Sequence, residues 1–132
     1  MPFDLHRATA FLYFVLLGLV AAINYIPGLT DDSGVAFGIF ALDIYDDALH
    51  AASALWALIS AVAGKRSSRL FLILFGAAYL GDGLLGLATG SGYLDFGIFN
   101  YGVRDFDWMF KILNNGPHIA LGGLALLVGL RR

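Results

Sequence analysis

The sequence predicts an all-α integral membrane protein, a four-transmembrane-helix bundle made from a duplicated two-helix unit. Its 132 residues are 59% hydrophobic and only 14% charged, which is too apolar for a water-soluble domain with a polar surface. Four apolar stretches divide the chain, and six of its eight basic residues lie before the first, between the second and third, or after the fourth. A tetrapeptide also occurs twice, at corresponding places in the two halves. Together these observations favour a bundle embedded in lipid.

The four apolar stretches differ in length. They cover residues 8–26, 48–63, 70–87 and 119–130. A helix needs about 20 residues to cross the hydrocarbon core of a bilayer, so the first and third stretches are long enough as they stand. The second and fourth reach that length only if their helices begin near Asp43 and Lys111, which brings polar residues into one end of each span. The expected helices are 5–26, 43–64, 69–89 and 111–131.

The distribution of basic residues predicts that both chain termini are cytoplasmic (N-in, C-in). By the positive-inside rule, the cytoplasmic positions are those of Arg7, Lys65, Arg66, Arg69, Arg131 and Arg132. The two remaining segments, 27–47 and 89–115, carry eight aspartates and only two basic residues, and we expect them outside. The predicted location is the bacterial cytoplasmic (inner) membrane, as a multi-pass protein.

A repeated motif indicates that the chain is duplicated. The tetrapeptide Phe-Gly-Ile-Phe occurs at 37–40 and 96–99, each time after an odd-numbered apolar stretch. Alignment of the segments that follow places His50 in register with His118, with nine more residues between tetrapeptide and histidine in the second copy. Both second helices run from outside to inside, so the repeat is parallel, with a pseudo-two-fold axis along the membrane normal. The two units cover about 5–64 and 69–132.

One face of each second helix carries a matched set of residues. Each set follows the i, i+4, i+7 spacing of one helical surface. Beyond the histidine, each set contains only small residues, as close helix packing in a bilayer requires. His50 and His118 are therefore expected to point into the bundle and away from lipid. The sets are Asp43, Asp47, His50, Ala54, Ala57 and Ala61, and Lys111, Asn115, His118, Gly122, Ala125 and Gly129.

A polar cluster is predicted at one depth in the bundle. With a rise of ~1.5 Å per residue, His50, His118 and Asp82 each lie ~20 Å from the cytoplasmic boundary. An intramembrane carboxylate costs about 2.5–3.5 kcal/mol on insertion scales, so Asp82 needs a partner. We expect one of the two histidines, or else Asn24 or a tyrosine hydroxyl such as that of Tyr25. The outer members of the cluster are Asn24, about one turn further out, and Asp47 and Asn115, one turn outside their histidines.

Three interpretations of this cluster follow from its chemistry. Polar side chains in a membrane hydrogen-bond between helices and fix their register, and this is the interpretation that we favour. Alternatively, His50 and His118 are facing ligands of a haem or other tetrapyrrole, or of a metal, with Asp82 supporting a ligand. A proton or ion relay through the same three residues is the third interpretation.

Several short motifs occur in order along nearly the whole chain. They are Asn24-Tyr25-Ile26-Pro27-Gly28, Gly38-Ile39-Phe40, Asp47-x-x-His50 and Asn115-x-x-His118. This order resembles a family of small four-helix bacterial membrane proteins that is classed as a domain of unknown function, in which GF-x-PG follows the first helix. In that family HN-x-x-H and DN-x-x-H begin the second and fourth helices; here Asp46 and Asp47 stand in place of the HN pair. The resemblance implies a four-helix membrane fold with this polar residue set, and it implies no particular chemistry.

The expected function is that of a non-catalytic accessory or scaffold subunit, which packs with larger membrane proteins or with itself in the lipid bilayer. Without cysteine the chain has no thiolate metal site and no cysteine nucleophile. No metal or cofactor is expected; the alternative is a carrier that binds haem or another tetrapyrrole through His50 and His118. A proton-coupled channel or transporter is the second alternative. Topology explains the basic residues, so nucleic-acid binding is not expected.

Overall fold

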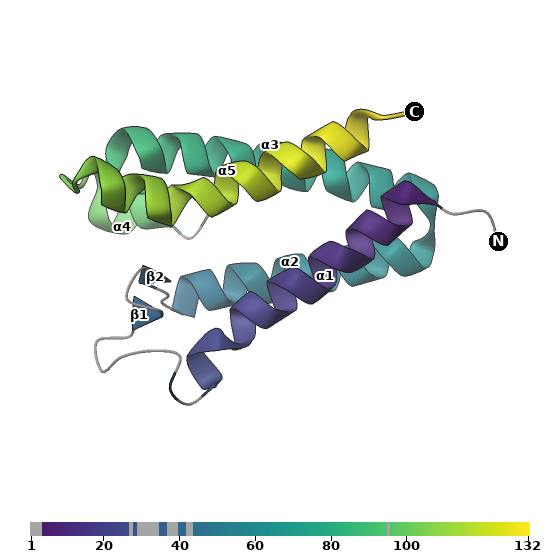
Figure 1. Ribbon diagram of the computed structural model, residues 1–132, viewed down its shortest axis with the longest axis horizontal. Coiled ribbons are helices and arrows are strands. Elements are labelled where there is room, and N and C mark those ends of the chain that lie inside the picture. Colours follow the sequence, from purple (N-terminus) through teal and green to yellow (C-terminus); the bar gives the residue numbers. More distant parts are fainter. Residues whose placement is uncertain (1–3, 27, 29–34, 37–39, 42–43, 95) are drawn as a thin grey trace.

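The chain folds almost entirely into helices (Figure 1). The computed structural model describes residues 4–26, 28, 35–36, 40–41, 44–94 and 96–132, and it describes their side chains except at residues 24, 35–36, 40–41 and 44–46. The long helices are α1 (Leu5–Ala22), α2 (Ile44–Ala63), α3 (Lys65–Thr89) and α5 (Trp108–Leu130). The short elements are the 3-10 helix η1 (Ile23–Tyr25), the antiparallel strands β1 (Val35–Ala36) and β2 (Phe40–Ala41), and α4 (Gly97–Tyr101).

The four long helices form two helical hairpins. α1 packs along α2, α3 packs along α5, and the hairpins are joined where α2 turns into α3 (Figure 1). α3 also contacts α1 and α2. Both chain termini lie at one end of the molecule, which we call the terminus end. β1, β2 and α4 lie at the opposite end, which we call the loop end (Figure 1).

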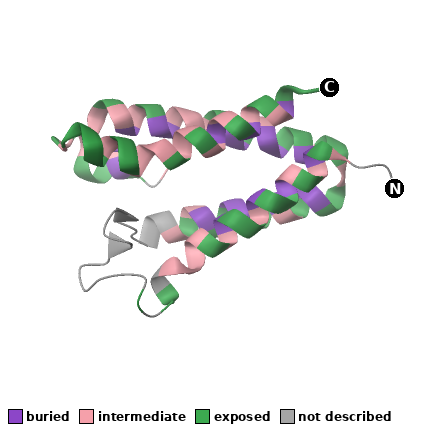
Figure 2. Cartoon of the chain, viewed as in Figure 1, coloured by how far each residue is buried: buried purple, intermediate pink, exposed green. Residues whose placement is uncertain are grey.

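Three helices, α1, α3 and α5, are long and apolar enough to cross a membrane, and the described part of α2 contains a shorter apolar helix, Asp47–Ala63. Exposed positions follow the outside of the helices (Figure 2), and long apolar side chains occupy many of them. Apolar coverage on this scale is typical of a surface in contact with lipid. The fold is therefore that of a helical membrane protein, as predicted. Exposed examples are Leu12, Leu19, Leu55, Val62, Leu74, Leu84, Leu124 and Leu127.

An aromatic core lies between the hairpins. Tyr13 of α1 and Phe71, Phe75 and Tyr79 of α3 are all buried. The rings of Phe75 and Tyr79 stack at a centroid distance of 3.9 Å, and Tyr13 meets Phe75 edge to face at 5.4 Å. The hydroxyl of Tyr13 donates a hydrogen bond to the carbonyl of Leu121 in α5. α3 carries most of this core and is the central helix.

Glycines allow the backbones of α3 and α5 to pack in contact. A Cβ atom added at Gly76 would lie 2.6 Å from the backbone nitrogen of Leu126, and Gly122 is similarly confined against the backbone of Leu80. In a bilayer, small residues at the interface permit this close approach and the dispersion contacts that come with it. The small-residue face predicted on α5 thus contacts α3.

In each hairpin, one arginine joins the two helices at the terminus end. Arg7 Nε of α1 donates to the carbonyl of Ala61 in the last turn of α2, at 2.9 Å. Arg69 Nε of α3 donates to the carbonyl of Gly129 in the last turn of α5, also at 2.9 Å. The last carbonyls of a helix have no partner within it and carry the negative end of its dipole. Both arginines therefore stabilise a helix C-terminus.

The boundaries of two helices differ from those expected because of short local features. α3 begins at Lys65 and not at residue 69, because Gly64 alone separates it from α2 and adopts a φ of 134°. Lys65 and Arg66 therefore lie in the first turn of a helix and not in a loop. α1 begins at Leu5 as expected, but it ends at Ala22, after which η1 continues the turn.

α5 begins at Trp108 and not at residue 111, because Asp107 caps the helix and accepts a hydrogen bond from a backbone N–H of its first turn at 2.8 Å. The helix also continues through Pro117, although proline lacks the backbone N–H that a helix interior uses. Packing explains this continuity. A Cβ atom added at Gly83 of α3 would lie 3.0 Å from the nitrogen of Ile119, so α3 supports α5 directly after the proline.

Three expectations concern parts of the chain outside the described residues. They are Asp43 as the first residue of the second helix, residues 37–39 of the first repeated tetrapeptide, and the side chain of Asn24.

Candidate functional site

The centre of the candidate site is the carboxylate of Asp82, which lies in α3 and is 3% exposed. Its Oδ1 atom accepts hydrogen bonds from the backbone N–H groups of Tyr93 and Leu94, both at 2.8 Å. After α3 the chain therefore turns back, and residues 90–94 form this turn. We call them the returning segment. Hydrogen bonds to an ionised acceptor are roughly twice as strong as neutral ones. The sequence-based cluster did not include these partners.

Two glycines allow the chain to return in this way. Gly90 ends α3 with a φ of 81°, in the left-handed region that favours glycine. A Cβ atom added at Gly92 would lie 2.8 Å from the Cγ atom of Asp82, so a side chain there would displace the carboxylate. Two glycines directly after an apolar stretch are the signal that could have indicated a tight turn here.

Arg104 holds the returning segment in place. Its backbone N–H donates to the carbonyl of Thr89 at 2.7 Å, and its Nε donates to Ser91 Oγ at 2.9 Å. Its guanidinium carbon lies 4.6 Å from the ring centroid of Tyr101 and 4.9 Å from that of Phe106. Cations are attracted to aromatic ring faces at such distances. The donors to Asp82 therefore belong to a well-supported segment at the loop end.

His118 of α5 is the second partner of Asp82. Its Nδ1 atom lies 2.6 Å from Asp82 Oδ2. With the carboxylate ionised, both of its oxygens can only accept, so Nδ1 carries the proton and donates it. The hydrogen bond orients the imidazole and leaves Nε2 for other interactions. The predicted contact between Asp82 and a histidine is present.

His50 of α2 faces His118 across the boundary between the hairpins. The two ring centroids are 6.0 Å apart, and the ring planes are inclined at 80°. His50 is 5% exposed, and within the described part of the chain its Nδ1 atom has no hydrogen-bond partner. A buried polar atom without a partner is unfavourable by ~1–3 kcal/mol. The Nδ1 atom of His50 can therefore form a hydrogen bond in addition to these contacts.

Tyr79 and Ser53 belong to the same boundary and were missing from the sequence-based cluster. The ring of Tyr79 lies 5.0 Å from that of His118, and its hydroxyl lies 3.2 Å from Ser53 Oγ. Tyr79 precedes Asp82 by three residues and Ser53 follows His50 by three, so each shares a helical face with a predicted member. This spacing is the signal that could have found them.

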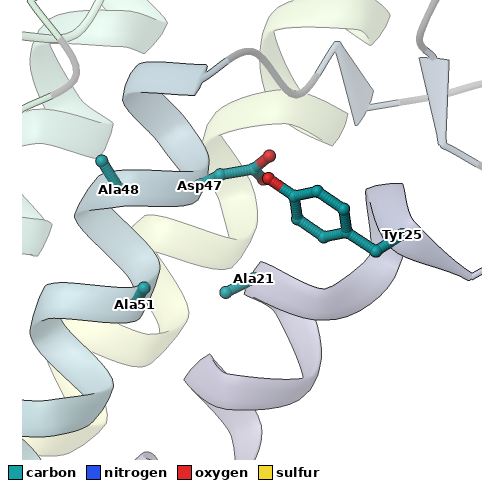
Figure 3. A pocket seen from close by; sticks show the side chains of 5 residues that line it. All are labelled: Ala21, Tyr25, Asp47, Ala48 and Ala51. Atoms are coloured by element: carbon teal, nitrogen blue, oxygen red, sulfur yellow. The ribbon is translucent and has the colours of Figure 1, made fainter.

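The outer predicted residues lie apart from the carboxylate. Asn115 rests against Gly86 of α3, and its Nδ2 donates to the carbonyl of Lys111 at 2.9 Å. Asp47 lines a separate pocket of about 250 Å³ between α1 and α2 near the loop end (Figure 3). The pocket lining is Ala21, Tyr25, Asp47, Ala48 and Ala51. Neither Asn115 nor Asp47 is therefore a partner of the central carboxylate.

The charge of Asp82 also acts on the returning segment. The hydroxyl of Tyr93 donates to the carbonyl of Ala78 at 2.6 Å. Burial, followed by the negative charge of Asp82, raises the pKa of Tyr93 above its usual value of 10.0. The neutral phenol is therefore the form that the fold favours.

The arrangement can hold and exchange a proton, because two imidazoles lie beside a carboxylate and imidazole changes its protonation near neutral pH. In the described ranges, no group of three or more His, Cys, Asp or Glu side chains could hold a metal ion. No protein-family model, curated protein sequence or solved structure matches this chain. Its function is therefore inferred from its own residues.

Proposed function

We propose that this chain is a four-transmembrane-helix protein of a bacterial cytoplasmic membrane, and that it acts as an accessory or scaffold subunit for larger membrane proteins. The distribution of polar and apolar side chains between the inside and the outside of the bundle supports this proposal. Polar groups such as those of Tyr13, Tyr79, Asp82 and His118 bond one helix to another inside, while long apolar side chains cover the outside. Such a surface offers similar contacts to lipid and to other transmembrane helices.

We also propose that the hairpins arose by duplication and that α2 crosses the membrane with the others. The arginine contacts at the terminus end support this. Ala61 and Gly129, which accept from Arg7 and Arg69, each lie eleven residues after the histidine of their helix. Each hairpin therefore makes the same bond at the same aligned position.

Tyrosines join the two hairpins to one another. Tyr13 of α1 donates to the backbone of Leu121 in α5, and Tyr79 of α3 pairs with Ser53 in α2. Leu121 and Ser53 each lie three residues after the histidine of their helix. In both directions, a tyrosine from the first helix of one hairpin reaches the same position in the second helix of the other. The tyrosines themselves are not equivalent, because Tyr13 lies six residues after Arg7 and Tyr79 lies ten residues after Arg69.

Photo-crosslinking in native membranes tests the scaffold role. A photoreactive residue at Leu74, which is 50% exposed on α3, should form adducts with a membrane protein. The same residue at Leu72, which is buried, should form none and is the matched control. The adducts are detected by electrophoretic mobility and identified by mass spectrometry. If Leu74 and the exposed Leu124 of α5 yield only lipid adducts, the chain is not a scaffold.

A proton-coupled role is the second candidate. It is supported by the buried Nδ1 of His50, which lies beside the His118–Asp82 pair and has no partner among the described residues. Proteoliposomes with an internal pH dye provide the test. His50→Gln should abolish a proton flux that Asp105→Asn, at an exposed position, leaves unchanged. Wild-type liposomes that leak protons no faster than protein-free ones would eliminate this candidate.

The tetrapyrrole alternative has less support. The ring of Tyr79 lies 5.0 Å from that of His118 and stacks on Phe75, in space that a macrocycle between the two imidazoles would need. A visible absorption spectrum of protein isolated from native membranes tests it, since a bis-histidine haem would give a strong Soret band that His118→Ala removes.

A further inference from the structure

The two hairpins differ at one place near the loop end. In the α3–α5 hairpin, the side chain of Ile119 packs on Gly83, where an added Cβ atom would lie 2.6 Å from Ile119 Cγ1. Pairing His50 with His118 makes Ala51 the equivalent of Ile119, and pairing Arg7 with Arg69, which make the same bond in the two hairpins, makes Ala21 the equivalent of Gly83. Both of these alanines line the pocket of about 250 Å³. Among the described residues, the first hairpin therefore leaves open a space that the second hairpin fills.

The pocket also carries a charge that its counterpart lacks. Asp47 lies on its lining, whereas the equivalent residue of the second hairpin is the neutral Asn115. Figure 3 shows the hydroxyl group of Tyr25, which lies in η1, turned toward the carboxylate of Asp47. A carboxylate accepts charge-assisted hydrogen bonds from a cation, and the oxygen of a tyrosine hydroxyl can accept another. The combination suits an ammonium group.

The pocket continues into an apolar surface along both helices. Ala48, Ala51 and Leu55 share one face of α2, and Leu55 is 58% exposed. On α1, Gly18 lies one turn from Ala21, and a Cβ atom added there would meet no atom within 4 Å. An acyl chain can lie along this open face. The pocket volume of about 250 Å³ is below the roughly 300–1,000 Å³ of pockets for drug-sized ligands, which fits a headgroup better than a large cofactor.

We propose that this pocket binds the ammonium headgroup of a zwitterionic phospholipid of the phosphatidylethanolamine type. The carboxylate of Asp47 and the hydroxyl oxygen of Tyr25 accept hydrogen bonds from the ammonium, and the alanines accommodate the adjoining part of the lipid. The lipid then fills the position between α1 and α2 that Ile119 fills between α3 and α5. This inference rests on the proposed duplication for its choice of equivalent residues.

Lipid binding to the purified full chain, measured by native mass spectrometry, tests the proposal. The probes are phosphatidylethanolamine and phosphatidylglycerol with identical acyl chains, and the wild type should prefer the first. Asp47→Asn and Ala51→Ile copy the residues of the second hairpin. Each should weaken phosphatidylethanolamine binding about tenfold, the first by removing the charge and the second by filling the space. Asp105→Asn removes an exposed aspartate and should change nothing.

Equal binding of both lipids by the wild type, or an unchanged preference in Asp47→Asn, would overturn the proposal. Tyr25→Leu, at a 74% exposed side chain, tests the site with little risk to the fold. It should also weaken phosphatidylethanolamine binding, and unchanged binding would count against the site. Soluble ethanolamine that displaces the lipid at equal concentration would assign the pocket to a free amine instead. The proposed duplication is tested separately by cysteines placed at Ser33 and Ser67. Labelling of both from the same side of the membrane would contradict it.

Discussion

Replacement of Asp82 by leucine is the most direct test of how the candidate site is organised. The substitution removes the acceptor of three donors, which are the backbone N–H groups of Tyr93 and Leu94 and the Nδ1 atom of His118. Each buried donor left without a partner is unfavourable by ~1–3 kcal/mol. Three such donors predict a loss of at least ~3 kcal/mol in the free energy of unfolding.

Asp82→Asn separates the hydrogen bonds from the charge. The amide oxygen can still accept from Tyr93 and Leu94, and the amide nitrogen can donate to His118 in its other tautomer. Only the additional strength of charge-assisted bonds is lost, so the expected loss is ~1–2 kcal/mol. If the chain is a scaffold, this variant should function normally. If it is a proton carrier, the variant should be inactive although folded.

Unfolding in a mild detergent by increasing amounts of dodecyl sulfate, followed by circular dichroism, measures both losses. Asp105→Asn, at an exposed position, is the control and should change stability by less than about 0.5 kcal/mol. An Asp82→Leu variant as stable as the wild type, or less affected than Asp82→Asn, would refute the assignment of Asp82 as the shared acceptor.

Three further predictions follow from topology, packing and titration. A cysteine at Ser33 should react with an impermeant maleimide from outside the cell, and one at Ser67 only after permeabilisation, since the basic residues favour the cytoplasm; the reverse pattern would invert the topology. Gly122→Ala should destabilise the fold by ~1–3 kcal/mol because its Cβ would meet the backbone of α3. By contrast Gly123→Ala, whose Cβ meets no atom within 4 Å, should be neutral or stabilise by up to ~1 kcal/mol; equal effects in thermal melts would contradict the packing. Because the pKa of Tyr93 is raised in the folded state, its phenol stabilises the fold below the unfolded-state pKa, and this contribution is lost as the pH rises through the folded-state pKa. The stability advantage of the wild type over Tyr93→Phe should therefore decline above pH 10.0, and an advantage that stays constant would argue against the shift.

The long helices could be predicted from the sequence because the apolar length needed to cross a bilayer is a strong, regular signal. Their ends could not be predicted as well, since each depends on a few local atoms. Asp107 starts α5 by capping it, and Gly64 allows α3 to follow α2 without a loop. Both signals are present in the sequence, but one aspartate among many acidic residues and one glycine among 17 do not by themselves identify a boundary.

The need of Asp82 for a partner was predictable, because the cost of an intramembrane carboxylate applies to any fold. The depth of His118 made it a candidate, and the contact is present. The returning segment was not predictable, since its path has no periodicity. It depends on contacts that close only in the folded chain, such as the bonds of Arg104 to Thr89 and Ser91. Hydrophobic periodicity locates helices and strands, but it gives no information about contacts of this kind between loop residues.

The proposed duplication gives a physical reason for the difference between the two histidines. When the first helices are aligned by pairing Arg7 with Arg69, which make the same bond in the two hairpins, the residue equivalent to Asp82 is Val20. The first hairpin thus has no carboxylate at the position from which Asp82 orients His118. The centroids of the two rings nevertheless lie 6.0 Å apart, so the imidazole that Asp82 orients lies beside one whose Nδ1 has no partner among the described residues. Under the proposed duplication, only the second copy has this carboxylate, so His118 fixes the register between α3 and α5 through its bond to Asp82. His50 is then the histidine that can bind a proton or a ligand, because its Nδ1 has no partner within the described part of the chain.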